Sequence, residues 1–117
     1  MKNFEKLGLS QELLTCIGHM GITIPTQIQG LSIPDIMKGR DVIGESATGS
    51  GKTLAFGCGI VEKVMPGKGL QSLILTPTRE LAEQVKDNLK DLTKTLKIIT
   101  VYGGVSINPQ IDKIKTA

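Results

Sequence analysis

Along the chain, two hydrophobic patterns alternate. In some segments apolar residues recur every three or four positions, and in short segments they run consecutively. The first pattern is typical of amphipathic helices and the second of strands that are buried on both faces. The first predicts helices over about 11–19, from Pro25-Thr26 onward, over 52–65, after Pro77 and over 109–115. The second predicts strands over 41–45, 72–76 and 98–102.

Capping residues support several of these helix ends. Ser10 is a suitable N-cap for the first helix, and Gly21 follows its end. Thr26 and Gln29 have the spacing of a capping box, in which each side chain satisfies a backbone donor near the other. Asn108-Pro109 is a suitable N-cap and first position for the last helix.

The predicted helix over 52–65 has two apolar stripes, which predicts burial on two sides. The stripes are Leu54, Cys58, Val61 and Met65, and Phe56, Ile60 and Val64. From residue 41 onward, strands and helices alternate, and the chain has no internal repeat or low-complexity segment. This order predicts an α/β fold with an open parallel sheet. With three strands, such a sheet would have a poorly protected edge, so association between copies through this edge is expected.

Composition restricts the class of protein further. The 117 residues suffice for one domain, and 39% of them are hydrophobic, although only 3% are aromatic. The net charge of +3 permits a nucleic-acid partner without requiring one. Lysines spread along 86–97 and 113–115 are expected to form only a solvated face.

The cysteine pattern argues against a zinc site. Cys16 and Cys58 lie far apart, and His19 is the one histidine, so four ligands are not readily supplied. We expect two buried, reduced thiols in a cytoplasmic protein. Charged residues interrupt the amino-terminal segment, and every apolar run is too short to span a bilayer, so neither a signal peptide nor a membrane partner is expected.

The segment Ser46–Thr53 (SATGSGKT) has the composition of a phosphate-binding P-loop between a strand and a helix. Its glycines allow backbone N–H groups to surround phosphate oxygens, and the following helix directs its positive end at the same anion. Lys52 would reach the β- and γ-phosphates of ATP, and the Thr53 hydroxyl would bind Mg²⁺. Ser46 replaces the first glycine of the strict motif, and an ordinary glycine-rich turn is the alternative interpretation.

Four blocks in order make the chain resemble the amino-terminal part of the first RecA-like domain of DEAD-box ATP-dependent RNA helicases. Residues 21–29, with PTQIQ at 25–29, resemble the Q motif, and 46–53 resemble motif I. Residues 77–82 (PTRELA) are identical to the motif Ia consensus, and 103–104 resemble the double-glycine motif. The resemblance spans the whole chain and implies a three-layer RecA-like sheet with helices on both faces.

The resemblance also implies site residues. Lys52 and Thr53 would act in catalysis, with Thr53 binding Mg²⁺. The cofactor-binding set would be Phe4, Ile22, Thr26, Gln29, Ser46, Ala47, Thr48, Gly49, Ser50, Gly51, Lys52 and Thr53. Gln29 would hydrogen-bond the adenine edge, and its capping-box role is compatible with this if each end of the amide serves one purpose.

RNA would contact the backbone of motif Ia and the double glycine, without base recognition. The implied residues are Pro77, Thr78, Arg79, Gly103 and Gly104. The first turn of the motif Ia helix would offer free N–H groups to a phosphate. Alternatively, Arg79 forms an ion pair with Glu80 or Glu83, and the glycines make a simple turn.

The sequence departs from the family pattern in three places. Ile22 stands where an aromatic often contacts adenine, and Ser46 and Ala47 vary motif I. The chain contains no Asp-Glu pair, so the Asp-Glu-Ala-Asp motif is absent, and these 117 residues are expected not to hydrolyse ATP. A complete non-catalytic nucleotide- or RNA-binding module and a superfamily 2 helicase that acts on DNA are the alternative functions.

Overall fold

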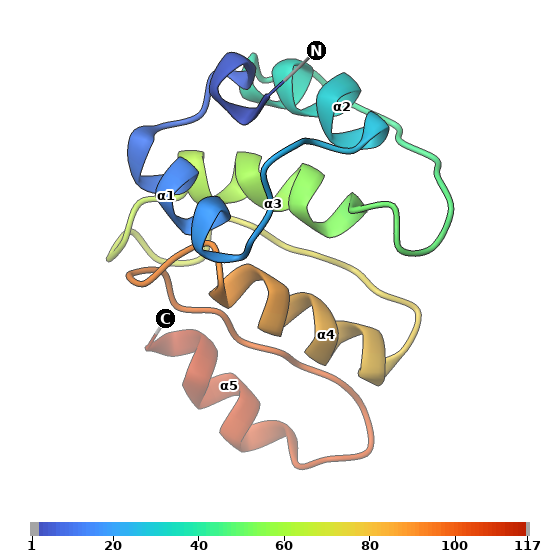
Figure 1. Cartoon of the computed structure of the whole chain (residues 1–117). Helices are drawn as coiled ribbons and strands as arrows, with labels where there is room; N and C mark the ends of the chain where they lie inside the picture. Colours follow the sequence, from blue (N-terminus) through green and yellow to red (C-terminus); the bar gives the residue numbers. More distant parts are fainter. Residues whose placement is uncertain (1–2, 117) are drawn as a thin grey trace.

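The computed structural model describes residues 3–116, and its regular elements are all helical within that range. The elements are the 3₁₀ helix η1 (Phe4–Leu7) and the α-helices α1 (Gln11–His19), α2 (Gln27–Met37), α3 (Lys52–Lys63), α4 (Arg79–Lys90) and α5 (Ile107–Lys115). Helices α2, α3, α4 and α5 follow one another from top to bottom in Figure 1, with η1 and α1 beside the first two.

The predicted helix ends are largely confirmed. The Ser10 hydroxyl accepts a hydrogen bond from the Leu13 N–H at 3.2 Å, and Gly21 follows α1 with a left-handed φ of 77°. Both bonds of the Thr26–Gln29 capping box are present at the start of α2.

Two predicted boundaries are wrong. Helix α3 ends at Lys63 rather than at 65, because Val64 takes an extended conformation. Helix α5 begins at Ile107 with Ser106 as its N-cap, so Asn108 is not the cap. Proline is tolerated at Pro109 because the first helical turn needs no N–H donor there.

Helix α3 packs against α1, α2 and α4, but the predicted burial of both of its apolar stripes is only partly confirmed. Leu54 and Cys58 are buried, whereas the stripe of Phe56, Ile60 and Val64 is half-buried and Met65 is 58% exposed. The buried core consists of Phe4, Leu7, Leu9, Leu13, Ile17, Ile33, Leu54, Cys58, Val85, Leu89 and Leu92. Two glycines allow its neighbours to approach closely. A Cβ on Gly59 would overlap the Ile36 side chain of α2, and a Cβ on Gly57 would lie 2.7 Å from Leu89 Cδ2 of α4.

The three predicted strands are not formed within residues 3–116. Residues 41–45, 72–76 and 98–102 are extended in Figure 1, but no backbone–backbone hydrogen bond of the described residues involves them. Apolar side chains on them face solvent, with Ile43 101%, Leu73 75% and Leu75 86% exposed. The prediction of a parallel sheet covered on both faces is therefore not borne out for the described part of the chain.

Open space lies between the extended segments. A groove of about 660 Å³ is lined both by 41–42 and by 71–72, and a second of about 400 Å³ is lined by 70–76 and by 96–101. Paired strands lie only about 4.7–4.9 Å apart, which leaves no such space. Each segment keeps strand-like backbone but lacks a neighbour at hydrogen-bonding distance.

The cysteine prediction is half right. Cys58 lies in the core, and burial, with a smaller contribution from the Glu62 charge, raises its pKa to about 12. Cys16 is only half-buried. His19 is exposed at the end of α1. None of the helices in residues 3–116 combines the length and the apolar character that a bilayer crossing needs.

Candidate functional site

The Gln29 side chain joins the start of α2 to the end of the P-loop. Its Oε1 accepts from the Thr26 N–H at 2.9 Å, and its Nε2 donates to the Gly51 carbonyl at 3.1 Å. The residue is only 2% exposed. A buried amide with both ends bonded is costly to displace, because each freed partner would lose a hydrogen bond away from water. Residues 25–29 and 46–53 are thereby brought together, as the sequence predicts.

Gly51 must be a glycine for two reasons. Its φ is 88°, in the left-handed region that side chains avoid. A Cβ there would also overlap Gln29 Nε2 and lie 3.3 Å from the Thr26 hydroxyl oxygen. We call the pair of hydrogen bonds that join the Gln29 amide to Thr26 and Gly51 the Gln29 clip. The clip can form only because position 51 carries no side chain.

The remaining P-loop contacts are local. Lys52 Nζ donates to the Ser46 carbonyl at 2.8 Å, so the side chain folds back over its own loop. The Ser46 and Ser50 hydroxyls share a hydrogen bond across the loop. The hydroxyl at position 46, where the strict motif has glycine, is thus used to close the loop.

The start of α3 has the features of an anion site. Its N-cap is Gly51, and no side chain caps it. Helix α5 likewise has no capping side chain, whereas Ser10, Thr26 and Thr78 cap α1, α2 and α4. The unsatisfied first-turn N–H groups and the helix dipole attract negative charge. Half-buried Thr53 follows Lys52 in this turn, and its hydroxyl is a hard oxygen ligand suited to Mg²⁺. These residues fit a Mg²⁺-bound phosphate.

Phe4 and Ile22 belong to the hydrophobic packing rather than to the surface of the loop. Phe4 is buried in the core, and Ile22 is half-buried and packs against it. Ala47, Thr48 and Gly49 are exposed on the loop. The structure thus brings Thr26 and Gln29 to the P-loop, while Phe4 contributes to the packing beneath this region.

The motif Ia helix begins differently from α3. The Thr78 hydroxyl accepts from the Leu81 N–H at 3.1 Å, so one first-turn donor that the sequence analysis left free is already bonded. Pro77, Thr78 and Arg79 are all exposed. Fewer backbone donors are therefore left for an anion than at α3.

Arg79 and the double glycine lie together. The Arg79 guanidinium carbon is 5.3 Å from the centre of the Tyr102 ring, and a Cβ on Gly104 would lie 3.6 Å from Arg79 Nη1. The alternative ion pair of Arg79 with Glu80 or Glu83 is absent: within residues 3–116, the one side-chain ion pair joins Arg40 and Asp35. Gly104 has a φ of 83°, so the turn interpretation of the pair is also correct.

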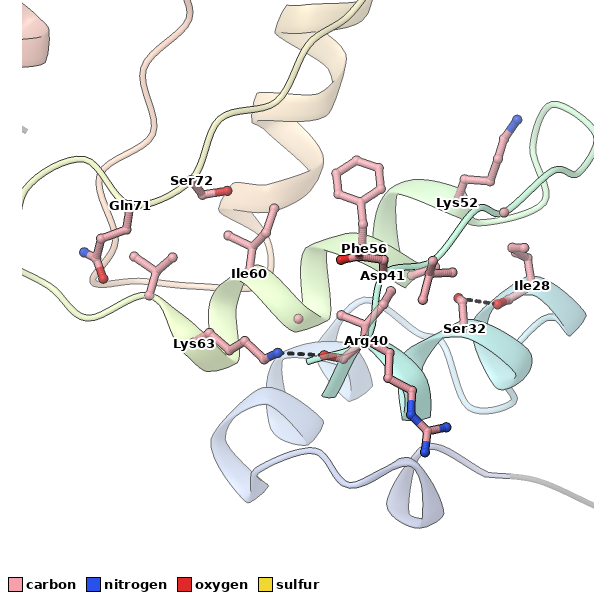
Figure 2. Close-up of a pocket in the computed structure, with 16 residues that line it drawn as sticks. Ile28, Ser32, Arg40, Asp41, Lys52, Phe56, Ile60, Lys63, Gln71 and Ser72 are labelled. Atoms are coloured by element: carbon pink, nitrogen blue, oxygen red, sulfur yellow. Dashed lines mark hydrogen bonds between the residues drawn. The ribbon is translucent and has the colours of Figure 1, made fainter. Parts of the chain in front are cut away.

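The larger groove adjoins the P-loop without covering it. Figure 2 shows Lys52 at one end and Gln71 and Ser72 at the other, with Phe56 and Ile60 of α3 between them. Lys63, which also lines the groove, donates from its Nζ to the Ile36 carbonyl at 2.7 Å. Of the predicted nucleotide residues, only Lys52 lines this groove.

Sequence reasoning missed the residues that surround Arg79. Tyr102 contacts its guanidinium, and Glu83 accepts hydrogen bonds from Thr100 Oγ1 at 2.8 Å and from Tyr102 Oη at 3.2 Å. These bonds, with Thr100 contributing most, lower the pKa of the Glu83 carboxyl. The contact between Arg79 and Tyr102 joins residues more than twenty positions apart, so local sequence patterns could not predict it. The one available indication was that Tyr102 directly precedes the double glycine.

A curated relative with high identity over this chain is the RNA helicase CrhR of Synechocystis sp. It is 45% identical over 114 residues, which is 96% of this chain and 23% of CrhR. The chain thus spans about a quarter of the length of that relative.

Solved structures show the same similarity. A DEAD box protein from Methanococcus jannaschii aligns with a TM-score of 0.91 and 42% identity, over 96% of this chain and 32% of that one. Dbp5 of S. cerevisiae, bound to RNA and ADP BeF3, aligns with a TM-score of 0.77 and 35% identity, over 85% and 26%.

These neighbours are RecA-like helicase domains, which supports the predicted fold class although the sheet itself is not formed here. The DEAD/DEAH box helicase model matches residues 26–117, from the Thr26 cap through both candidate sites. The chain therefore belongs to the DEAD/DEAH box helicase family.

Proposed function

We propose that the chain binds the phosphates of ATP at Ser46–Thr53 and an RNA backbone at motif Ia and the double glycine, within an ATP-dependent RNA helicase. The observation that carries the proposal is the start of α3. It has no capping side chain, it follows a loop with left-handed Gly49 and Gly51, and it presents Lys52.

The nucleotide would be bound by P-loop groups that bond to one another in this structure. Lys52 would exchange its bond to the Ser46 carbonyl for the phosphates, and Thr53 would hold Mg²⁺, which supplies charge stabilisation at the transferred phosphoryl group. Gln29 keeps one unused proton on Nε2 and one lone pair on Oε1 after its two protein bonds. The adenine edge would use these, with Phe4 and Ile22 supporting the Q motif.

RNA would be bound through its phosphates and 2′-hydroxyls. Arg79 has no carboxylate partner among the described residues, so its charge is available to a phosphate. Gly103 and Gly104 are exposed and let a nucleic-acid backbone come close to the protein backbone. Dbp5, a structural neighbour, is bound to RNA in its solved structure.

These residues alone are expected to bind nucleotide without turning it over, because no Asp-Glu pair is present to hold Mg²⁺ and activate water. In the proposal, Cys16 and Cys58 stay as free thiols, as a reducing cytoplasm would keep them. The exposed apolar residues of 72–76 favour association between copies at high concentration.

The nucleotide site is tested by titrating a fluorescent ADP analogue against wild type and Lys52→Ala. Loss of a charged hydrogen bond is worth about 1.5–3 kcal/mol, so affinity should fall about tenfold to a hundredfold. Lys63→Ala is the matched control, since Lys63 lies on the same helix and also donates to a backbone carbonyl. Equal affinities of wild type and Lys52→Ala would overturn the P-loop assignment.

Base choice and nucleic-acid choice separate the proposal from its alternatives. Preference for ADP over GDP should weaken in Gln29→Ala, and an unchanged preference would remove Gln29 from the adenine contact. RNA should bind more tightly than DNA of the same sequence, because the 2′-hydroxyl is read. Tighter binding of DNA would favour the DNA helicase alternative.

A further inference from the structure

Tyr102 lies beside the proposed RNA site but belongs to none of the motifs that define it. Its ring lies 5.3 Å from the guanidinium carbon of Arg79, and that guanidinium in turn lies against Gly104. Arg79 is thus held between an aromatic ring and the glycine turn. A cation over an aromatic face gains about 0.5–1 kcal/mol at an exposed site.

Glu83 is one helical turn from Arg79, the position from which a glutamate would ordinarily pair with an arginine. Instead, its Oε1 accepts from both Thr100 and Tyr102. Two consequences follow. The Tyr102 ring is anchored to α4, and the Arg79 charge is not neutralised by its nearest carboxylate within the described residues.

Gln110 fixes the backbone of the same segment. The Tyr102 N–H donates to Gln110 Oε1 at 2.7 Å, and Gln110 Nε2 donates to the Ser106 carbonyl at 3.1 Å. The side chain of α5 therefore spans the loop that contains Gly103 and Gly104. Side-chain contacts between α4, residues 100–104 and α5 therefore connect the Tyr102 ring, the glycine turn and the first turn of α4.

We propose that Tyr102 is a positioning residue for RNA binding. Glu83 anchors its ring and Gln110 its backbone, and the ring holds the Arg79 guanidinium beside Gly104, ready for a phosphate. This rests on the proposed RNA site. A free arginine side chain loses rotamer entropy when it binds, and a pre-positioned one loses less of it. The ring is occupied by Arg79, which agrees with binding through the RNA backbone rather than through stacked bases.

The test uses the 117-residue chain and a fluorescein-labelled uridine oligonucleotide, with affinity measured at several salt concentrations. Arg79→Gln should weaken binding and reduce the salt slope by about one phosphate contact. Tyr102→Leu should weaken binding about two- to fivefold, the equivalent of the cation–ring energy. In the Tyr102→Leu background, Arg79→Gln should cost less than in wild type, because the two residues act through one contact.

Three controls make the result specific. Tyr102→Phe keeps the ring and should stay within about twofold of wild type, since only the hydroxyl bond is lost. Lys94→Gln removes an exposed charge just beyond α4 and should leave the salt slope unchanged. Each variant should bind the ADP analogue as wild type does, which verifies that it is folded.

A second readout does not need RNA. The Tyr102 ring current should shift the NMR signal of the Arg79 Nε–H, and the shift should disappear in Tyr102→Leu and persist in Tyr102→Phe. Additive RNA effects of Arg79→Gln and Tyr102→Leu, or a ring-current shift that is absent from wild type, would overturn the positioning role and leave the RNA site standing. If wild type binds no RNA, both the proposed RNA site and the positioning role fail, although the ring contact itself is still measured.

Discussion

Helices α3 and α4 both begin within a family motif that follows an extended segment, but their first turns differ. At α3 the N-cap is the left-handed Gly51, which has no capping side chain, and the buried Gln29 amide donates to its carbonyl. At α4 the Thr78 hydroxyl caps the helix, and the groups around Arg79 are exposed or half-buried. A buried contact is costly to break, whereas an exposed one is partly replaced by water. Changes near α3 should therefore cost more stability than changes near α4.

The largest effect is expected for Gly51→Ala. All three substitutions Gly51→Ala, Gly49→Ala and Gly104→Ala place a side chain at positive φ, which costs about 1–2 kcal/mol. Only at Gly51 does the new Cβ meet the Gln29 amide; at Gly49 no atom lies within 4 Å, and at Gly104 the nearest is 3.6 Å away. Urea unfolding should show Gly51→Ala as the least stable, by about a further 1–3 kcal/mol for lost hydrogen bonds. Equal urea midpoints for the three variants would show that the contact between Gly51 and Gln29 does not contribute to stability.

An intermediate effect is expected for Gln29→Leu. The Thr26 N–H and the Gly51 carbonyl would lose their partner in a buried place, at a cost of about 1–3 kcal/mol. The counterpart at the other helix is Thr78→Ala, which removes an exposed cap worth about 1 kcal/mol. Thermal unfolding of both variants measures the difference. A larger loss for Thr78→Ala would reverse the ranking of the two regions.

The smallest effect concerns pH. Hydrogen bonds from Thr100 and Tyr102 lower the Glu83 pKa from 4.5, so this carboxylate stabilises the fold above pH 4.5, and the contribution is lost as pH falls through the lowered folded-state pKa. The chain has one tyrosine and no tryptophan, so Tyr102 emission reports this site directly. Emission should change on acidification below pH 4.5, and Glu83→Gln should remove that change. The Gln29 clip has no titrating group, so ADP affinity in Glu83→Gln should match wild type throughout.

Local sequence features predicted the helices well. Ser10, the Thr26–Gln29 box and the helical spacing act within one or two turns, so the sequence locates α1 and α2 closely. The errors at Val64 and Asn108 are errors of one turn or less. The strand prediction failed for a different reason: apolar runs identify segments suited to a sheet, but a ladder exists only where a second strand lies alongside.

The candidate sites divide in the same way. The order of residues alone determined that a glycine-rich loop precedes α3, that Lys52 and Thr53 occupy its first turn, and that Arg79 begins α4. Only the tertiary structure decided that Gln29 bonds Gly51, and that Tyr102, Thr100 and Gln110 surround the Arg79 site. Capping and turn formation depend on neighbours in the sequence, whereas these contacts join positions 8 to 23 residues apart, which only packing brings together.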